Sequence, residues 1–543
     1  MKLKCFALFA LSGAVLFSCT DKKDKGGTTH QSMLQAPSDI VVTQLSETSF
    51  DIRWTDNSKG ETGFGIYLIN ANDIDNPRLC GNADADATQY TLTQEGMEYS
   101  KSYYIGVKAL AEDSRYDSKM VKQMFTTAPA PDPYAPKVSV KDIKGSAVCV
   151  AVSLQMENVA ADLDYGVCWG TDENVEKKSA NSQRAAAMSG DDTGAVKVTV
   201  SNVLLDYGKE YYFRGYAVKN GSTVYSEAVK CSLTDAPQAI SLNWKDISDG
   251  SLPTSVKVYE TTDKLNGRNF HAWYAVADLS KGEVEFKVAV PDKAMTIDDQ
   301  SKANAGCLVM VNGGYFYNGR NTGIAYVDGV ASGSVTAVRG SLKAADAEYN
   351  EMYTVTRGIF GVDAEGKASV YWGATDASGK NYFFPRPMPS VKGEAKYGPV
   401  SATNPTDCIQ WNPKYAQSAG PLLLKDGKCP FDFATTDKGE DFYSSNFEIM
   451  PYDIYGPSVK PDRTAAGYTS DGRVILFICD GRIEESDGAT LTELAMIMKG
   501  LGCVGAVNFD GGGSTGMMMC GVHLNDTTAE NRPVVSTLGF YKK

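Results

Sequence analysis

Two aspartates that each follow a short apolar run are the residues best suited to chemistry in this sequence. Asp480 follows "VILFIC", and Asp510 follows "CVGAVNF". Runs of this kind predict buried strands, and a carboxylate at the end of a strand can act as a base or a nucleophile. The 543 residues include only 3 histidines. Catalysis through a histidine pair or a multi-histidine metal site is therefore not expected, and carboxylates become the default acid/base candidates.

Glycines and hydroxyl groups surround the second aspartate and one other strand end. In "DGGGST", three glycines and two hydroxyl residues follow Asp510, which is typical of a backbone nest whose N–H groups bind an anion or sugar hydroxyls. The spacing matches neither a P-loop nor the G-x-G-x-x-G fingerprint. A glycine pair also follows Asn312 in "VMVNGGYF". Single glycine pairs often mark only bulges, so neither pattern identifies a site by itself.

The segment between the two aspartates predicts a helix. Thr490 is suited to be its N-cap, with Glu493 three residues on, and the apolar residues at helical spacing are Leu491, Leu494, Ala495 and Met498. Strand, helix and strand in this order form a βαβ-like unit. Open α/β sheets hold ligands at the carboxyl ends of their strands, so we expect Asp480 and Asp510 to face one site.

Five segments taken together, in chain order, resemble the phosphodiester glycosidase family: "NGGYF", "GPLLLKDG", "RTAAGYTSDGRVILFICDGR", "TLTELAMIMKGLGCVGAVNFDGGGSTGM" and "NRPVVSTLGF". The resemblance covers residues 239–543 and implies an α/β domain that hydrolyses a sugar-1-phosphodiester. By motif, it implies catalytic roles for Asp510, Asp480 and Arg463. It implies substrate-binding roles for Asn312, Gly313, Gly314, Thr464, Gly511, Gly512, Gly513, Ser514 and Thr515. Phe509 and Thr515 stand where leucine and serine are frequent in the family.

These residue types suit that reaction. The departing phosphate monoester is a stable anion, so the reaction needs general acid catalysis less than ordinary glycoside hydrolysis does. It needs a carboxylate for the anomeric carbon or the attacking water, and donors for the phosphate charge. Asp510 or Asp480 supplies the carboxylate. Arg463 and the glycine-loop N–H groups supply the donors, because a guanidinium binds phosphate oxygens in a bidentate way. The alternative for Arg463 is a buried ion pair that holds Asp480.

Alternating strand patterns fill the chain before this region. Residues 36–128 and 133–234 each predict a β-sandwich, and Trp54 and Tyr103 resemble the core residues of a fibronectin type III module. Neither stretch contains a cluster suited to chemistry, so we interpret both as spacers rather than sugar-binding modules. The expected fold is thus two all-β fibronectin type III-like sandwiches followed by an α/β (mixed α+β) domain over residues 236–543.

The N-terminus predicts export. Residues 1–18 have the pattern of a signal peptide, and "LFSC" resembles a bacterial lipobox, which implies lipidation of Cys19. Residues 19–35 form a polar tether. We therefore expect an extracytoplasmic protein, lipid-anchored to a bacterial membrane, with the outer membrane favoured. The alternatives are a plain secretory signal and an uncleaved anchor.

The net charge and the cysteine spacing limit the kinds of ligand and metal that we expect the protein to bind. The formal net charge of −13 argues against nucleic acid, which calls for a basic face. No C-x-x-C pair occurs, so a zinc site is disfavoured. No D-x-D-x-D-G motif occurs either, so calcium is not predicted, although scattered carboxylates could supply a site. The expected partner is a carbohydrate or phosphoglycan substrate, with no cofactor and no metal.

Three functions remain open from the sequence. The favoured one is an extracytoplasmic hydrolase of a glycan phosphodiester. The first rival is a carbohydrate- or polymer-binding lipoprotein of the cell envelope that does not cleave its ligand. The second is a hydrolase that acts on glycosides without phosphate.

The lipobox gives a direct test of the anchor. Replacing Cys19→Ala removes the thiol that accepts the lipid, so the variant should move from the membrane fraction to the soluble fraction. Fractionation of cells that express each protein measures this. Membrane retention equal to that of the wild type would contradict lipidation at Cys19.

Overall fold

The computed structural model of the chain describes residues 32–131, 133–160, 163–185, 194–335, 338–339, 352–354, 356–387, 391–392, 399–431, 448, 459–525 and 532–543. The predicted signal peptide, Cys19 and most of the predicted tether lie outside these residues. The chain divides into two compact units, Met1–Pro133 and Tyr134–Lys543, and each is considered by itself. No helix among the described residues is long and apolar enough to cross a membrane.

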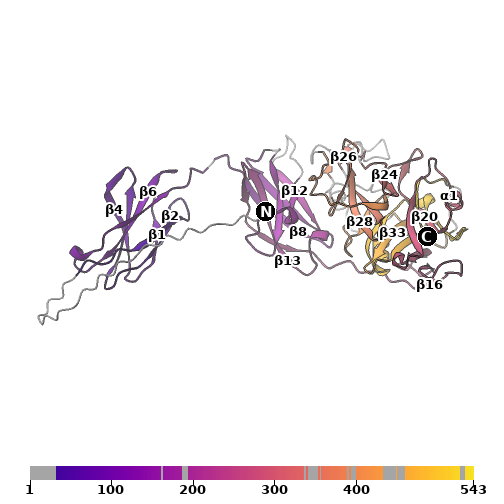
Figure 1. The fold of residues 1–543 in the computed structure, drawn as a ribbon, viewed down its shortest axis with the longest axis horizontal. Helices are drawn as coiled ribbons and strands as arrows, with labels where there is room; N and C mark the ends of the chain where they lie inside the picture. Colours follow the sequence, from indigo (N-terminus) through magenta and orange to yellow (C-terminus); the bar gives the residue numbers. More distant parts are fainter. Residues whose placement is uncertain are drawn as a thin grey trace. The chain divides into compact units, whose positions relative to one another are not determined.

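The first unit is a sandwich of two antiparallel sheets. One sheet has the order β1 (Ser38–Gln44), β2 (Ser49–Thr55), β5 (Gln89–Thr93), and the other has β4 (Asp73–Ala83), β3 (Gly63–Asn70), β6 (Ser102–Leu110), β7 (Val121–Thr126) (Figure 1). Trp54 is buried against Phe64, and the Tyr103 hydroxyl accepts the Glu98 N–H at 3.1 Å. This is consistent with a fibronectin type III-like module. Strand β4 was not predicted, because its side chains are mostly exposed and show no alternation.

The second module, which opens the second unit, repeats this architecture. One sheet pairs β12 (Ala195–Ser201), β9 (Cys149–Glu157) and β8 (Lys137–Gly145). The other contains β11 (Ser182–Arg184), β10 (Asp164–Gly170), β13 (Glu210–Lys219), β14 (Ser222–Tyr225) and β15 (Val229–Ser232). The Tyr211 hydroxyl accepts the Asp206 N–H at 3.0 Å, as Tyr103 does in the first module. The shared contact supports the prediction of two related sandwiches.

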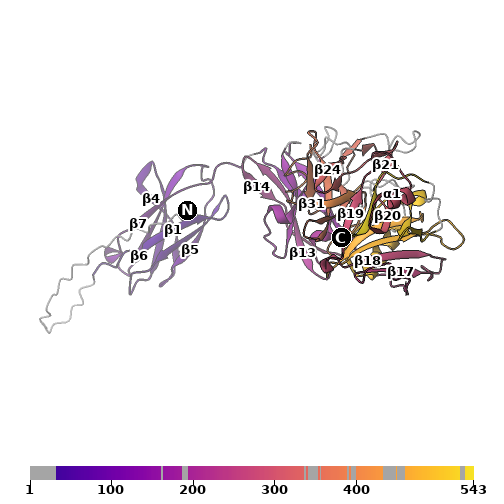
Figure 2. The ribbon, with the colours of Figure 1, turned by 45° about the vertical axis from the view of Figure 1, so that its right-hand side comes forward.

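Three large sheets and two small ones, β21–β22 and β25–β26–β30, occur among the described residues of the C-terminal domain (Figure 2). The seven-stranded sheet has the order β16 (Lys245–Asp246), β17 (Val256–Thr261), β18 (Ala272–Ala277), β34 (Val474–Cys479), β33 (Arg463–Thr469), β35 (Cys503–Asn508), β32 (Leu422–Leu424). The five-stranded sheet has β19 (Val284–Ala289), β38 (Thr537–Lys542), β20 (Cys307–Asn312), β36 (Met517–Met519), β37 (Val522–His523). The six-stranded sheet has β24 (Val330–Ser332), β23 (Ala325–Val327), β31 (Pro413–Ser418), β27 (Arg357–Asp363), β28 (Ala368–Thr375), β29 (Asn381–Phe384).

The domain is mostly β, which corrects the α/β expectation in part. Helix α1 (Ile297–Ala303) is short, and α4 (Leu491–Gly500) is the predicted helix, with the Thr490–Glu493 capping box in place. Helix α4 connects β34 to β35 as expected, but β33 lies between these strands and runs antiparallel to both. Apolar runs do not encode strand direction, so the sequence did not reveal this insertion. The carboxyl ends of β34 and β35 therefore flank the beginning of β33.

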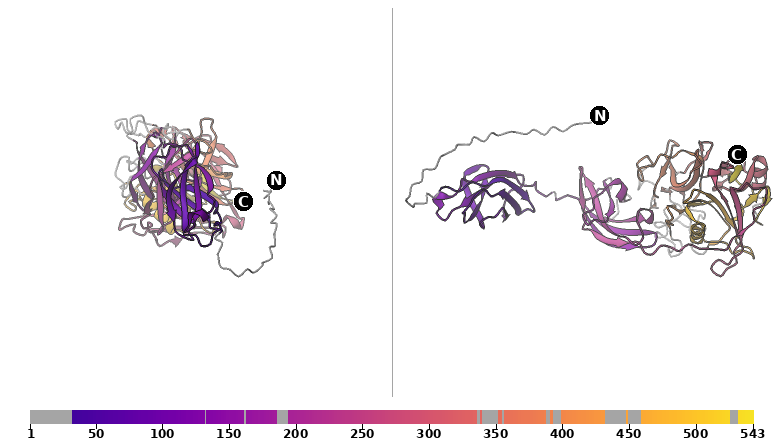
Figure 3. Two further views of the ribbon diagram at one scale, coloured as in Figure 1. Left: turned by 90° about the vertical axis from the view of Figure 1, so that its left-hand side faces the viewer. Right: turned by 60° about the horizontal axis from the view of Figure 1, so that its bottom comes forward.

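Segments far apart in the sequence complete each sheet. Strand β38 lies between β19 and β20, and β34 pairs with β18. In Figure 3 the yellow C-terminal strands run among the rose-coloured strands that open the domain. Side chains from the seven-stranded and five-stranded sheets share one buried apolar cluster with the six-stranded sheet. The candidate site is therefore supported by a well-packed hydrophobic core.

Buried polar contacts join the second module to the C-terminal domain. Asn202 Nδ2 donates to the carbonyl of Cys429 at 2.7 Å, and the buried Arg386 guanidinium donates to Ser182 O at 2.8 Å. Lys428 Nζ donates to Leu205 O at 2.7 Å. The spacer interpretation therefore suits the first module better than the second.

Shortening the chain tests this difference. A chain that starts at Tyr134 should keep the thermal midpoint of the C-terminal domain. A chain that starts at Ala236 loses the Ser179 and Ser182 carbonyls that accept from Arg386 but keeps its Thr406 contact. It should unfold about 5 °C lower, because a charged buried hydrogen bond contributes about 1.5–3 kcal/mol and 1 kcal/mol shifts the midpoint by about 2–4 °C. Calorimetry of both chains measures the midpoints. Equal midpoints would show that both modules are independent spacers.

Candidate active site

The buried side chain of Asn312 is the centre of the candidate site. It lies at the end of β20 and donates from Nδ2 to the carbonyl of Asp510 at 2.6 Å. Its Oδ1 accepts the Thr464 hydroxyl at 2.6 Å and the Gly516 N–H at 3.3 Å. Three segments, from β20, β33 and the loop after β35, are thereby brought together. The predicted residues Asn312, Thr464 and Asp510 thus belong to one network.

Asp510 contributes a carboxylate next to this network. It is partly buried, and its N–H donates to Gly313 O at 3.1 Å. Burial raises the pKa of the Asp510 carboxyl above its ordinary value, whereas Ser514, the Arg532 guanidinium and the Gly511 N–H lower it in part. A carboxylate with a raised pKa is a stronger base, which suits proton abstraction.

Asp480 occupies a more enclosed position. It is 2% exposed, and its Oδ1 accepts the Asn525 amide at 3.1 Å. Asn525 also accepts the Met517 N–H at 3.0 Å and donates to Thr515 O at 3.3 Å. Asp480 and Asp510 are therefore linked through the segment 515–525. The geometry favours Asp480 as a residue that orients this segment.

Arg463, at the start of β33, is also enclosed. It is 2% exposed, and it donates from Nε to Ala489 O at 2.9 Å and from Nη2 to Val459 O at 3.1 Å. These bonds direct the guanidinium to the backbone of its own chain. The structure therefore supports a positioning role for Arg463 better than direct contact with phosphate.

The glycines are required by close approach of the chain to itself. A Cβ atom at Gly511 would lie 2.6 Å from the carbonyl oxygen of Asp462, and one at Gly313 would collide with Ser536. Gly512 has a left-handed φ of 60° and donates to Asp462 O at 3.0 Å. Gly314 donates to the Ser536 hydroxyl at 3.0 Å.

Some N–H groups of the nest predicted at Gly511–Thr515 are thus already hydrogen-bonded within the protein. The Ser514 N–H donates to Gly511 O, and the Thr515 N–H donates to Gly512 O. Gly513 lies in the same short turn, which spans Gly512–Ser514. The Thr515 hydroxyl lies 3.4 Å from the Thr464 hydroxyl. The threonine that stands where serine is frequent in the family therefore makes a contact inside the site.

Two arginines that were not predicted as site residues lie near Asp510 and near the glycine loop, respectively. Arg532 is exposed, acts electrostatically on Asp510, and lies over the Phe316 ring at 5.8 Å. Arg482 donates to Asp462 Oδ2 at 2.8 Å and would be 3.0 Å from a Cβ at Gly512. Both residues occur inside the motif segments quoted above, "NRPVVSTLGF" and "ICDGR", which was the available signal.

Unpartnered polar atoms also collect here. Among the described residues, buried atoms without a hydrogen-bond partner include Gln417 Oε1 and Asn508 Oδ1. Asn508 donates to the Tyr315 hydroxyl at 3.0 Å, next to the predicted glycine pair, and Gln417 closely borders Gly314. Polar atoms left unpaired in a protein interior are candidates for contact with ligand hydroxyls. The sequence alone gave no reason to select them.

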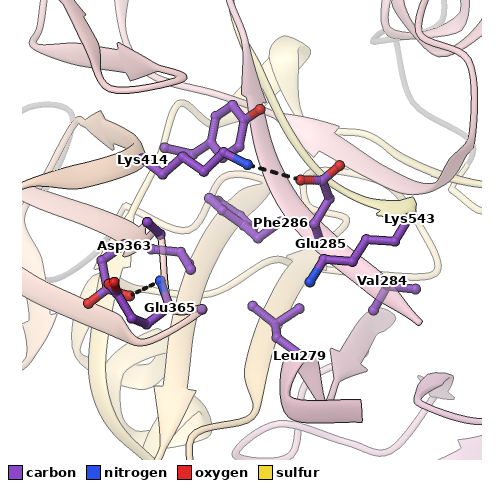
Figure 4. A pocket seen from close by; sticks show the side chains of 12 residues that line it. Leu279, Val284, Glu285, Phe286, Asp363, Glu365, Lys414 and Lys543 are labelled. Atoms are coloured by element: carbon purple, nitrogen blue, oxygen red, sulfur yellow. Dashed lines mark hydrogen bonds and ion pairs between the residues drawn. The ribbon is translucent and has the colours of Figure 1, made fainter. Parts of the chain in front are cut away.

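A hollow elsewhere on the domain contains none of the predicted residues. Leu279, Phe286 and Tyr415 line it, together with charged side chains (Figure 4). Glu285 pairs with Lys414 at 3.4 Å, and Asp363 accepts backbone N–H groups. The hollow holds none of the residues of the Asn312 network, which remains the better candidate.

Sequence comparisons relate part of the chain to known proteins. Residues 305–541 match the sequence model of the phosphodiester glycosidase family. The chain is 35% identical over 82 residues to the SPbeta prophage-derived uncharacterized protein YomE of Bacillus subtilis (strain 168), a match that takes in 15% of this chain and 13% of that protein.

Two solved structures are also similar. The catalytic domain of zebrafish N-acetylglucosamine-1-phosphodiester alpha-N-acetylglucosaminidase, auto-inhibited by its pro-peptide, is 19% identical, with a TM-score of 0.34, and the match covers 56% of this chain and 89% of that one. A fibronectin type III domain of human collagen XX is 18% identical, with a TM-score of 0.16, and the match covers 19% of this chain and 100% of that one. The Asn312 network lies inside residues 305–541, the part of this chain that matches the phosphodiester glycosidase family.

Proposed function

We propose that this protein hydrolyses a sugar-1-phosphodiester bond in a glycan, outside the cytoplasm, from a lipid anchor at Cys19. The observation that carries the proposal is the position of Asp510. It is a carboxylate with a raised pKa, in a family-matched domain, and it lies close to the exposed Arg532. A base next to a cation suits a substrate that combines an anomeric carbon with a phosphate.

In the proposed step, Asp510 takes a proton from water as the water oxygen bonds to the anomeric carbon. The bond from that carbon to the phosphate oxygen breaks, and its electron pair leaves with the phosphate monoester. Arg532 stabilises the phosphate charge, supported by Arg482 at the glycine loop. No strong general acid is required, because the leaving group is already a stable anion.

The enclosed residues hold this arrangement. Asn312 and Thr464 fix the backbone of Asp510 through hydrogen bonds of 2.6 Å. Arg463 fixes the start of β33 through backbone carbonyls. Asp480 orients the 515–525 segment through Asn525. Gln417 Oε1 and Asn508 Oδ1 are placed to accept sugar hydroxyls.

Replacing Asp510→Asn tests the chemical step. The amide keeps the size of the side chain but cannot accept the proton, so kcat on a synthetic sugar-1-phosphodiester should fall by at least ~100-fold, with little change in substrate binding. Steady-state kinetics together with binding of the uncleaved substrate to the variant measure both quantities. Absence of turnover by the wild type would favour a binding protein instead.

Replacing Arg532→Gln tests the phosphate contact by comparing two substrates. It should raise KM and lower kcat for the phosphodiester, but leave any slow turnover of an aryl glycoside without phosphate unchanged. An equal loss on both substrates would contradict a phosphate contact. Faster wild-type turnover of the aryl glycoside than of the phosphodiester would favour the rival glycoside hydrolase.

The raised pKa of Asp510 gives an independent prediction for stability. In the unfolded chain the group ionises near its ordinary pKa, and in the folded protein it ionises at a higher pH. The folded state therefore holds the proton more tightly, so stability falls as pH rises from the ordinary value through the raised one. Asp510→Asn removes this loss. In urea unfolding, the stability of the variant relative to the wild type should rise across that pH range, and a pH-independent difference would contradict the pKa shift.

A further inference from the structure

Three carboxylates meet at one end of the first module, far in sequence from the candidate active site. Asp56 directly follows β2, Glu61 precedes β3, and Asp86 precedes β5. One carboxylate oxygen from each lies within 4.8 Å of those of the other two. Oxygens that bind one calcium ion at 2.3–2.6 Å lie at most about 5 Å apart, so a single ion can reach all three.

Glu61 is the informative member of this group. Its side chain is only 6% exposed, and its Oε2 has no hydrogen-bond partner, whereas its Oε1 accepts the Asp86 N–H at 3.1 Å. None of the ion pairs between described residues involves Asp56, Glu61 or Asp86. Burying a carboxylate oxygen without a partner is unfavourable, and a bound cation removes that cost.

The two aspartates complete an open but anionic site. Asp56 is partly buried, and its Oδ1 accepts the Ser58 N–H at 2.8 Å, which fixes the turn after β2. Asp86 is exposed and has a left-handed φ of 60°, which turns the loop at this point. The ion therefore has a path from solvent, and water can fill the remaining coordination positions.

We propose that the first module binds one calcium ion through Asp56, Glu61 and Asp86. Three carboxylates and no thiol or imidazole form a hard, oxygen-only donor set, which disfavours zinc. The donors come from two loops, Asp56 and Glu61 from the β2–β3 loop and Asp86 from the β4–β5 loop, and calcium tolerates such irregular geometry, whereas magnesium demands a near-ideal octahedron. Strands β2 and β5 belong to one sheet and β3 to the other, so the ion links both sheets at this end.

Calorimetric titration of CaCl₂ into the purified, chelator-treated full-length protein tests the site. The wild type should bind one calcium ion that the Glu61→Gln variant does not bind, with Kd of about 10⁻⁴ M, the range of extracellular calcium modules. Asp86→Asn, on the exposed side of the site, should weaken binding at least ~10-fold. Glu95→Gln changes an exposed carboxylate of the same module and should bind as the wild type does.

Thermal unfolding keeps the proposal testable if a variant is poorly folded. Calcium should raise the midpoint of the wild type and of Glu95→Gln. In chelator, Glu61→Gln should be at least as stable as the wild type, because the buried charge is gone, and calcium should not raise its midpoint. Equal calcium binding by wild type and Glu61→Gln would overturn the proposal, and so would magnesium binding as tightly as calcium at this site.

Discussion

The hydrogen bonds of one buried amide hold the candidate active site together. Asn312 ends β20 in the five-stranded sheet, Thr464 begins β33 in the seven-stranded sheet, and Asp510 follows β35. The Asn312 side chain contacts both other residues, so the two sheets must meet at this point. Aspartate could not donate to the Asp510 carbonyl, and a shorter side chain would leave buried donors and acceptors unpaired. Every other contact of the site is arranged around this constraint.

The sequence allowed the elements next to Asp480 and Asp510 to be predicted because their signals are local. The capping box at Thr490 and Glu493 defines the start of α4, and apolar runs define β34 and β35. The sandwich cores around Trp54 and Tyr103 follow from strand alternation in the same way. Strand direction, the insertion of β33, and the burial of Arg463 depend on long-range pairing, which local patterns do not contain. Arg532 was missed because its role depends only on proximity to Asp510 in space.

The glycines of the loop after Asp510 can be explained both by packing within the protein and by ligand binding. The close contacts of the loop are largely with Asp462 and Arg482, so the absence of side chains is explained before any ligand is considered. The tight turn also sets the direction of the Asp510 carboxylate and places Ser514 beside it. Packing and chemistry therefore select the same residues at these positions. A motif of this kind identifies the location of a site more securely than it identifies which atoms bind the substrate.

The central position of β38 has a consequence for biogenesis. Strands β19 and β20 pair with β38 and not with each other, although β38 follows them by more than two hundred residues. A ribosome must therefore synthesise almost the whole domain before the five-stranded sheet can close. Such non-local pairing slows folding. During synthesis the earlier strands present unpaired edges until β38 has been made.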